Sequence, residues 1–370
     1  MLTVQIVQGV AVKQRPILLA LAGVTVVAIA VLLWPTAEDT NSASQTTATI
    51  AEAPVALSCK SDTPQGEKPG MQWPGMQWIE GGSFQMGTEA AYREESPVRT
   101  VHVDGYWIDT HETTNREFTQ FIGETNYVTV AERVPNAADI PGAPPEMLLP
   151  GSAMFRQPTR LLSAEIMQWW IYKPGANWRH PEGPGSSIDH RMDFPVVHIA
   201  FEDAQAYATW AGKDLPTEAQ WEFAARSKLD GSTYAWGEVR LPEGKHLANT
   251  WQGLFPIQNT EDDGYAAASP VGCFPPNAYG LHDMIGNVWE WTADRYAPRH
   301  TAAQTENPIG PSEEQSYAPN QPGFPVRVIK GGSFLCAPNY CMRYRPAARQ
   351  AQDTGLGSDH IGFRTVINSM

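Results

Sequence analysis

The spacing of hydrophobic positions divides the chain into four parts. Residues 16–34 form an uninterrupted apolar run, PILLALAGVTVVAIAVLLW, without a charged side chain. Residues 35–70 show no apolar period and are rich in Ser, Thr, Ala, Pro and Gly. From Met71 onward, short apolar stretches alternate with Gly turns. The pattern predicts a cytoplasmic tail at 1–15, a membrane anchor or signal sequence at 16–34, a flexible linker at 35–70 and a folded domain at 71–370.

The apolar run is close to the ~20 residues that a helix needs to cross a bilayer. Lys13 and Arg15 precede it, whereas Glu38 and Asp39 follow it. The basic flank should therefore stay in the cytoplasm and the folded domain should be exported. The run exceeds the ~7–15 residues of a signal-peptide core, so we favour an uncleaved transmembrane helix. A cleaved signal peptide is the alternative, and the domain would then be secreted.

Several short strands are predicted in the folded domain. One half-buried strand is indicated by alternating apolar positions, namely Val101, Val103, Tyr106 and Ile108. A second strand is expected at residues 196–199. The tetrapeptide GGSF occurs twice, at 81–84 and 331–334. These two copies are predicted to form a pair of strands, each entered through a Gly turn.

Three helices are predicted, and all are short. The first spans residues 114–123 and is closed by Gly123. The second begins at about Glu202 and ends at Gly212. The third follows Thr217, which forms a capping box with Gln220. Few helices are expected in 227–370, and 300–325 should be a surface excursion. The fold class is therefore an irregular single α/β (α+β) domain.

Composition narrows the possible functions. The chain has 40 acidic and 26 basic residues and a net charge of −14, so nucleic acid is not an expected partner. Gly and Pro each occur 31 times alongside 13 Trp, which favours a turn-rich globular domain over coiled coils. No zincin, P-loop or serine-hydrolase motif is present.

Two of the four cysteines are candidates for chemistry. Cys336 and Cys341 flank a predicted turn that contains Pro338 and Asn339. Two thiolates in a near-linear arrangement would suit Cu(I), whereas an ordinary disulfide is the alternative. Nearby positive charge would lower a thiol pKa, and three arginines follow: Arg343, Arg345 and Arg349. Cys59 is expected to be an incidental thiol, and Cys273 a buried free thiol.

Other polar and aromatic positions are less specific. Oxygen-bearing side chains in the turns at 249–265 and 283–290 could bind calcium, but such loops are usually only solvated. Most tryptophans should pack in the core, among them Trp169, Trp170, Trp178, Trp289 and Trp291.

An ordered series of motifs identifies a family resemblance over about residues 73–367. The series includes GGSFQMG, GANWRHPEGP, WAGKDLPTEAQWEFAAR, GLHDMIGNVWEWTAD, KGGSFLCAPNYCMRYRPAAR and HIGFRT. Together they resemble the formylglycine-generating enzymes, or sulfatase-modifying factors. The resemblance implies a fold related to C-type lectins, with little regular secondary structure.

The resemblance also implies an activity and its site. Members oxidise a cysteine in a Cys-x-Pro-x-Arg segment of sulfatases to Cα-formylglycine with O2, and the substrate is expected to bind unfolded or extended. The family's copper-binding cysteines correspond to Cys336 and Cys341, its catalytic serine to Ser333, and its active-site tryptophan to Trp289.

Two calcium sites are further implied by the resemblance. One corresponds to Asn249, Thr250, Asp263 and Tyr265, and the other to Asp283, Gly286, Val288 and Glu290. Asp283 replaces an asparagine common at this place. One cysteine of a eukaryotic core disulfide corresponds to Pro346, and no N-glycosylation sequon occurs, which suggests a bacterial member.

Two alternatives stay open on the same scaffold. One is a related oxidase that acts on a different substrate, although the His-x-x-x-His-x-Glu motif of iron-dependent sulfoxide-forming relatives is absent. The other is a non-catalytic lectin-like binding module, which would have no reason to keep the cysteine pair. A monomer is assumed.

Overall fold

The computed structural model describes residues 59, 73–138, 140, 142–159, 169–300 and 304–369. The predicted tail, the anchor at 16–34 and nearly all of the linker lie outside these residues, so those predictions stay untested. Within the described part of the chain, no helix has the length and apolarity to span a membrane.

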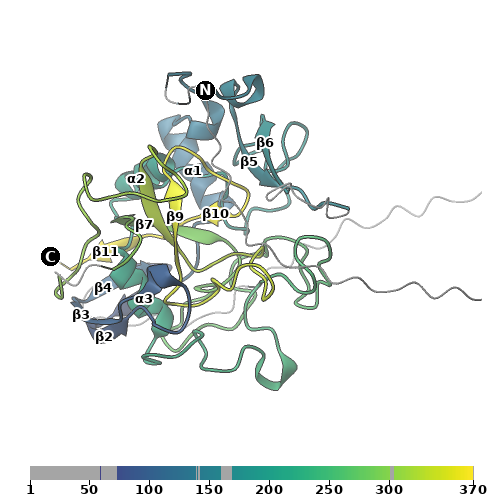
Figure 1. Cartoon of the computed structure of the whole chain (residues 1–370). Helices are drawn as coiled ribbons and strands as arrows, with labels where there is room; N and C mark the ends of the chain where they lie inside the picture. Colours follow the sequence, from purple (N-terminus) through teal and green to yellow (C-terminus); the bar gives the residue numbers. More distant parts are fainter. Residues whose placement is uncertain are drawn as a thin grey trace, which may run out of the picture. The chain divides into compact units, whose positions relative to one another are not determined.

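A four-stranded sheet lies at the centre of the folded domain (Figure 1). Its strands follow the order β10-β7-β8-β9, with bounds Trp289–Arg295 for β7, Val326–Lys330 for β8, Arg349–Asp353 for β9 and Ile361–Gly362 for β10. β8 is antiparallel to β7 and β9, whereas β10 is parallel to β7.

The other strands form a three-stranded sheet and two hairpins. The sheet has the order β1-β4-β11 and joins the start and the end of the domain, with bounds Met76–Ile79, Tyr106–Asp109 and Val366–Asn368. The hairpins are β2 (Gly82–Met86) with β3 (Arg99–Val103), and β5 (Gly151–Phe155) with β6 (Trp170–Pro174).

All three predicted helices are present, and the ends of the first two lie two residues from the predicted ones. They are α1 (Asn115–Thr125), α2 (Phe201–Trp210) and α3 (Glu218–Arg226), and four 3₁₀ helices accompany them: η1 (Arg93–Glu95), η2 (Val130–Glu132), η3 (Pro145–Leu148) and η4 (Pro242–Gly244). The capping box of Thr217 and Gln220 is confirmed. α1 continues past Gly123 to Thr125. Its C-cap is Asn126, whose left-handed backbone (φ 53°) ends the helix in place of the predicted glycine.

The strand predictions were partly wrong. The 101–108 segment is two strands, β3 and β4, and its four apolar residues are buried as expected. Residues 196–199 are not a strand, because His198 has a φ of 61° and breaks the extended backbone. The described residues beyond 227 contain only the short helix η4 and are otherwise strands and turns, as predicted.

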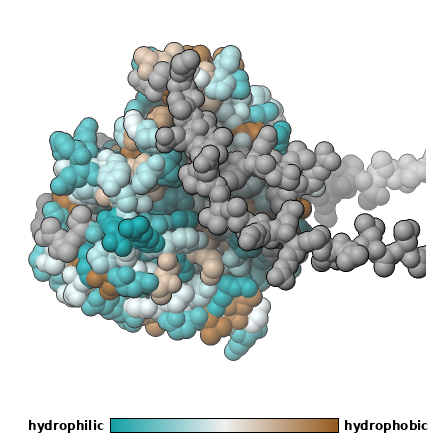
Figure 2. Space-filling view, viewed as in Figure 1, coloured by the Kyte–Doolittle hydropathy of each residue, from teal (hydrophilic) through white to brown (hydrophobic). Residues whose placement is uncertain are grey.

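Charged side chains as well as aromatic rings fill the interior. Trp178, Trp221, Trp289 and Trp291 are almost completely buried, in agreement with the expected packing role of tryptophan. The face of the molecule shown in Figure 2 mixes hydrophilic and hydrophobic residues, with hydrophobic ones only in small groups.

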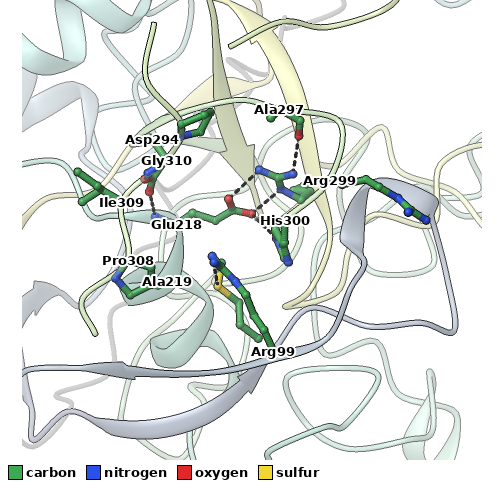
Figure 3. Close-up of a pocket in the computed structure, with 13 residues that line it drawn as sticks. Arg99, Glu218, Ala219, Asp294, Ala297, Arg299, His300, Pro308, Ile309 and Gly310 are labelled. Atoms are coloured by element: carbon green, nitrogen blue, oxygen red, sulfur yellow. Dashed lines mark hydrogen bonds and ion pairs between the residues drawn. The ribbon is translucent and has the colours of Figure 1, made fainter. Parts of the chain in front are cut away.

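A buried ion network lies where α3 meets the central sheet. Glu218, at the start of α3, lies 3.5 Å from His300 Nε2 (Figure 3). Glu218 also accepts from Arg349 Nε at 2.7 Å and Nη2 at 2.9 Å. Lys330, at the end of β8, lies 3.6 Å from Glu218 and 3.0 Å from Glu222. Burial alone would raise the pKa of Glu218, but Arg349, His300 and Lys330 hold that pKa well below its usual value.

Candidate active site

Cys336 and Cys341 come together as two buried free thiols. Their Sγ atoms are 2.9 Å apart, whereas a disulfide bond is ~2.05 Å long. The side chains are almost wholly enclosed, with 2% and 8% of each residue exposed. The disulfide alternative is therefore wrong for this pair in the structure, and the predicted convergence of the sulfurs is confirmed.

The two thiols differ in their tendency to ionise. A hydrogen bond from Cys336 and the nearby Arg343 guanidinium lower the pKa of Cys341 to about 7, whereas burial raises the pKa of Cys336. Of the three arginines considered for this role, only Arg343 acts on the thiols. Arg345 and Arg349 instead pair with the buried Glu95 and Glu218.

The turn that carries the thiols is fastened to a neighbouring loop. Asn339 Nδ2 donates to the Phe255 carbonyl at 3.1 Å, and Asn339 Oδ1 accepts from the Phe255 N–H at 3.3 Å. Trp251 N–H donates to the Cys336 carbonyl at 3.1 Å. The loop at 249–265 therefore holds the thiol turn at its start, Cys336, and at its middle, Asn339.

Ser333 and Trp289 are both tied to a residue that the sequence did not single out, His360. Ser333 Oγ lies 2.9 Å from His360 Nδ1, and the Trp289 N–H donates to the His360 carbonyl at 2.8 Å. Ser333 is also joined to the thiol turn, because its carbonyl accepts from the Cys336 N–H at 2.9 Å. The structure thus connects all four predicted catalytic residues.

The GGSF copy at 331–334 is not a strand, contrary to the prediction. β8 ends at Lys330, and the φ values of Gly331 (95°) and Gly332 (76°) turn the chain away from the sheet. A Cβ at Gly332 would lie 3.0 Å from the backbone of Arg343 and Tyr344. Glycine is needed here because the chain passes this closely to the segment that follows the thiols.

Aromatic rings pack against one another beside the thiol turn. Tyr340, 46% exposed, stacks on Phe255 with ring centroids 4.4 Å apart. Trp169 packs edge-on against both rings. Leu254 and Met342 are exposed beside them in the sequence. This surface could hold an extended peptide by side-chain packing.

The first predicted calcium set is brought together. Asp263 accepts from the Thr250 and Tyr265 N–H groups at 3.1 and 3.0 Å. The Gln252 amide nitrogen contacts both the Thr250 carbonyl and Asp263 Oδ2. Asn249 Oδ1 is buried without a hydrogen-bond partner. A buried oxygen without a hydrogen bond fits a cation that prefers oxygen ligands.

The second set has a more mixed character. Both oxygens of Glu290 already accept from Arg364, at 2.7 Å each, so their charge is partly balanced. Asp283 Oδ2 accepts from the Gly272 N–H at 2.6 Å. Glu112, which sequence reasoning missed, is fully buried near them, and its Oε2 has no hydrogen bond. Burial and the neighbouring Asp283 raise the pKa of Glu112, and the Arg364 guanidinium lies 4.0 Å from its Oε2.

No three His, Cys, Asp or Glu side chains gather into a metal-binding group within the described ranges. A calcium ion would therefore depend on amide and backbone oxygens as well as carboxylates, as in the sets above.

Cys59 and Cys273 were both misassigned. They form a disulfide that joins positions 214 residues apart. Cys273 follows Gly272, whose N–H is bonded to Asp283. The bond therefore attaches the residues before the domain to the loop beside the second calcium set. Linear spacing gave no sign of this pair, because its members lie so far apart.

Comparison with known proteins gives the same family as the motifs. Residues 61–369 match the family described as sulfatase-modifying factor enzyme 1-like domain. The chain belongs to this family.

Its relatives include a formylglycine-generating enzyme of Mycobacterium tuberculosis, 45% identical over 78% of this chain and 96% of the relative. A mouse formylglycine-generating enzyme is 42% identical over 79% of this chain and 74% of its own length. The solved structure of PvdO from Pseudomonas aeruginosa shares the fold at a TM-score of 0.55 and 23% identity, covering 82% of this chain and all of that one.

Members of the sulfatase-modifying family are not all named as active enzymes. A bovine relative, 37% identical over 77% of this chain and 85% of its own length, is named inactive C-alpha-formylglycine-generating enzyme 2. Membership therefore leaves activity to be argued from the site itself.

Proposed function

We propose that this chain oxidises a cysteine in Cys-x-Pro-x-Arg segments of sulfatases to Cα-formylglycine, with O2 as electron acceptor. The observation that carries the proposal is the buried, reduced pair of Cys336 and Cys341, 2.9 Å apart and joined through the turn to Ser333. The names of the relatives support the same reaction.

The reaction removes two electrons from the substrate β-carbon. Its C–S bond and one C–H bond break, water supplies the aldehyde oxygen, and the sulfur leaves as hydrogen sulfide. The two protons and two electrons pass to O2, which becomes hydrogen peroxide, or water when a thiol reductant supplies two further electrons. The protein has to hold the β-carbon and O2 in place rather than provide a strong base.

The paired thiols fit Cu(I). Cys336 and Cys341 are soft donors that face one another, and Cys341 ionises readily because its pKa is lowered to about 7. Copper, when bound, would supply the activation of O2. Ser333 and Trp289 would shape the polar pocket next to it, and the aromatic surface around Tyr340 would hold the extended substrate.

Two calcium ions are proposed as structural partners. The first would be held by Asn249, Thr250, Asp263 and Tyr265, and the second by Asp283, Gly286, Val288 and Glu290, with Glu112 beside them. The first set lies in the loop that fixes Cys336 through Trp251. We therefore expect calcium removal to lower the melting temperature and to loosen the thiol turn, which terbium luminescence and thermal unfolding would detect.

The catalytic domain is proposed to work outside the cytoplasm, as a monomer attached through residues 16–34. The Cys59–Cys273 disulfide supports export, because such bonds persist in oxidising compartments. The charge asymmetry around the apolar run points the same way.

The deciding experiment uses the full chain in detergent, loaded with Cu(I) under reductant. A synthetic Cys-x-Pro-x-Arg peptide is added in air and followed by mass spectrometry and an aldehyde-reactive probe. Copper-dependent conversion of thiol to aldehyde is the expected result. No conversion by a folded, copper-bound protein would refute the proposal and favour a different substrate or a binding module.

A further inference from the structure

We propose that His360 is a positioning residue of this site, which holds the Ser333 hydroxyl and the Trp289 backbone in register with the thiol turn. The inference rests on the proposed function, and it concerns the first residue of the HIGFRT motif, to which the family resemblance gave no role. His360 precedes β10, on the edge of the central sheet.

The side chain of His360 defines the direction of the serine hydroxyl. Leu335 N–H donates to Ser333 Oγ at 3.3 Å, which uses one acceptor position of that oxygen. The hydroxyl hydrogen is then best directed to His360 Nδ1, 2.9 Å away. This arrangement corresponds to a neutral imidazole with its proton on Nε2.

The surroundings keep that imidazole neutral and in place. Burial and the nearby His198 lower the pKa of His360 to about 3, so the ring stays an acceptor at physiological pH. Trp170 lies against the ring with centroids 4.9 Å apart, and Phe334 contributes a second contact at 6.5 Å. The β5–β6 hairpin, through Trp170, therefore helps to orient His360, which in turn orients Ser333.

The backbone of His360 makes the second connection. Its carbonyl accepts from the Trp289 N–H at 2.8 Å, where β10 begins to pair with β7. One residue thus links Ser333, at the entrance to the thiol turn, with Trp289, at the start of β7. A side chain that loses the Ser333 contact should misdirect the hydroxyl without removing a ligand of the proposed copper.

The test compares three variants of the full, copper-loaded chain. His360→Leu removes the acceptor and keeps an apolar side chain, whereas His360→Asn retains an oxygen that can accept from Ser333. The matched control is His102→Leu, because His102 Nδ1 makes an exposed contact with Ser83 Oγ at 3.2 Å. The readouts are kcat and KM for aldehyde formation, and Cu(I) affinity by competition with a chelator.

We expect His360→Leu to lower kcat by about 10- to 100-fold, with KM and Cu(I) affinity within about threefold of wild type. His360→Asn should restore most of kcat, and His102→Leu should behave as wild type. In the double variant with Ser333→Ala, His360→Leu should add little further loss, because both changes remove one contact.

Two outcomes overturn the inference alone: a kcat for His360→Leu within about twofold of wild type, or equal losses for the leucine and asparagine variants. If His360→Leu does not fold, the double-variant comparison is made with His360→Asn, and independent losses for Ser333→Ala and His360→Asn count against the inference. Absence of aldehyde formation by wild type overturns the proposed function, and this inference with it.

Discussion

The two GGSF copies have the same four residues, and in each copy the serine hydroxyl contacts a histidine, yet the two backbones differ. In the first copy, Ser83 lies on β2 and its Oγ is 3.2 Å from His102 on β3. In the second copy, Ser333 follows the end of β8 and its Oγ is 2.9 Å from His360. The first contact is exposed, whereas Ser333 is completely buried.

The difference teaches that the surroundings, and not the tetrapeptide, set the role of the serine. Water competes for the Ser83–His102 contact, so that contact should contribute little. At Ser333 water is excluded, and the rings of Trp170 and Phe334 contact the histidine. The second copy is also followed by the thiols, whereas the first continues into a hairpin.

The largest effect on activity should come from the thiols, which follow the second GGSF copy and have no counterpart after the first. Cys341→Ser should abolish Cu(I) binding at the pair and reduce aldehyde formation by at least about 10³-fold, because one soft ligand is lost. Mass spectrometry of the peptide and a chelator competition measure both effects. Full activity of Cys341→Ser would refute the copper mechanism.

Cys273→Ser is the control for that change. It also replaces a cysteine, but it breaks a disulfide and leaves the thiol pair intact. It should retain activity while the free energy of unfolding falls by about 2–4 kcal/mol.

The second-largest difference should be between the two serines in their effect on kcat. Ser333→Ala should lower kcat by about 10²-fold, since a buried, oriented hydroxyl is lost from the reaction pocket. Ser83→Ala, which removes the same group from the exposed copy, should leave kcat unchanged. Steady-state kinetics with the peptide substrate makes the comparison, and similar losses for both variants would contradict it.

The residues ahead of each copy should differ in their effect on stability. Lys330 is fully buried and lies 3.0 Å from Glu222, whereas Glu80 ahead of the first copy is exposed. Lys330→Met removes one of the cations that balance the buried Glu218 and Glu222, which then rely on Arg349 and Arg226, and should cost about 3 kcal/mol. Glu80→Gln should change the free energy of unfolding by less than about 0.5 kcal/mol. Urea unfolding gives both values, and a cost for Lys330→Met as small as that for Glu80→Gln would show that the remaining arginines suffice.

The smallest effect concerns the acids next to the two histidines. Burial raises the pKa of Asp359 to about 7, and its Oδ1 has no hydrogen bond. Because the folded-state pKa is above the unfolded one, the stabilisation is complete below about pH 4 and is lost as pH rises through about 7. Between pH 5 and pH 8 the free energy of unfolding should fall for both proteins, and the fall should be about 1–2 kcal/mol smaller for Asp359→Asn than for wild type.

Denaturant unfolding at both pH values tests this prediction. Asp104→Asn is the matched control, since Asp104 lies 3.6 Å from His102 and its side chain is 68% exposed. That control should follow the wild-type pH dependence. If Asp359→Asn also follows it, Asp359 is already ionised in the folded protein at pH 5.

Local signals in the sequence predicted local structure well. Thr217 and Gln220 predicted the start of α3, and the spacing of Cys336 and Cys341 predicted that their sulfurs lie close together. Both features depend on residues only a few positions apart. The motif series gave the family, which the comparisons confirm. The roles assigned to Ser333 and Trp289 and both metals stay predictions.

Contacts between distant segments could not be predicted in the same way. The strand expected at 196–199 failed because His198 takes a left-handed backbone, with its Nε2 2.8 Å from the Pro181 carbonyl. Cys59 forms its disulfide with a cysteine 214 residues away in the sequence. His360 begins the HIGFRT motif and Glu112 lies in none of the quoted motifs, but the sequence indicated a partner for neither, and only the folded chain places them beside Ser333 and Asp283.

The Cys59–Cys273 bond makes residues 59–273 a covalently closed ring. A protease cut anywhere between those two positions opens the ring but releases no fragment until the bond is reduced. If the chain is anchored through residues 16–34, only a cut before Cys59 can shed the catalytic domain from the membrane directly. After a cut between Cys59 and Cys273, retention of the domain at the membrane would depend on the redox state of its surroundings.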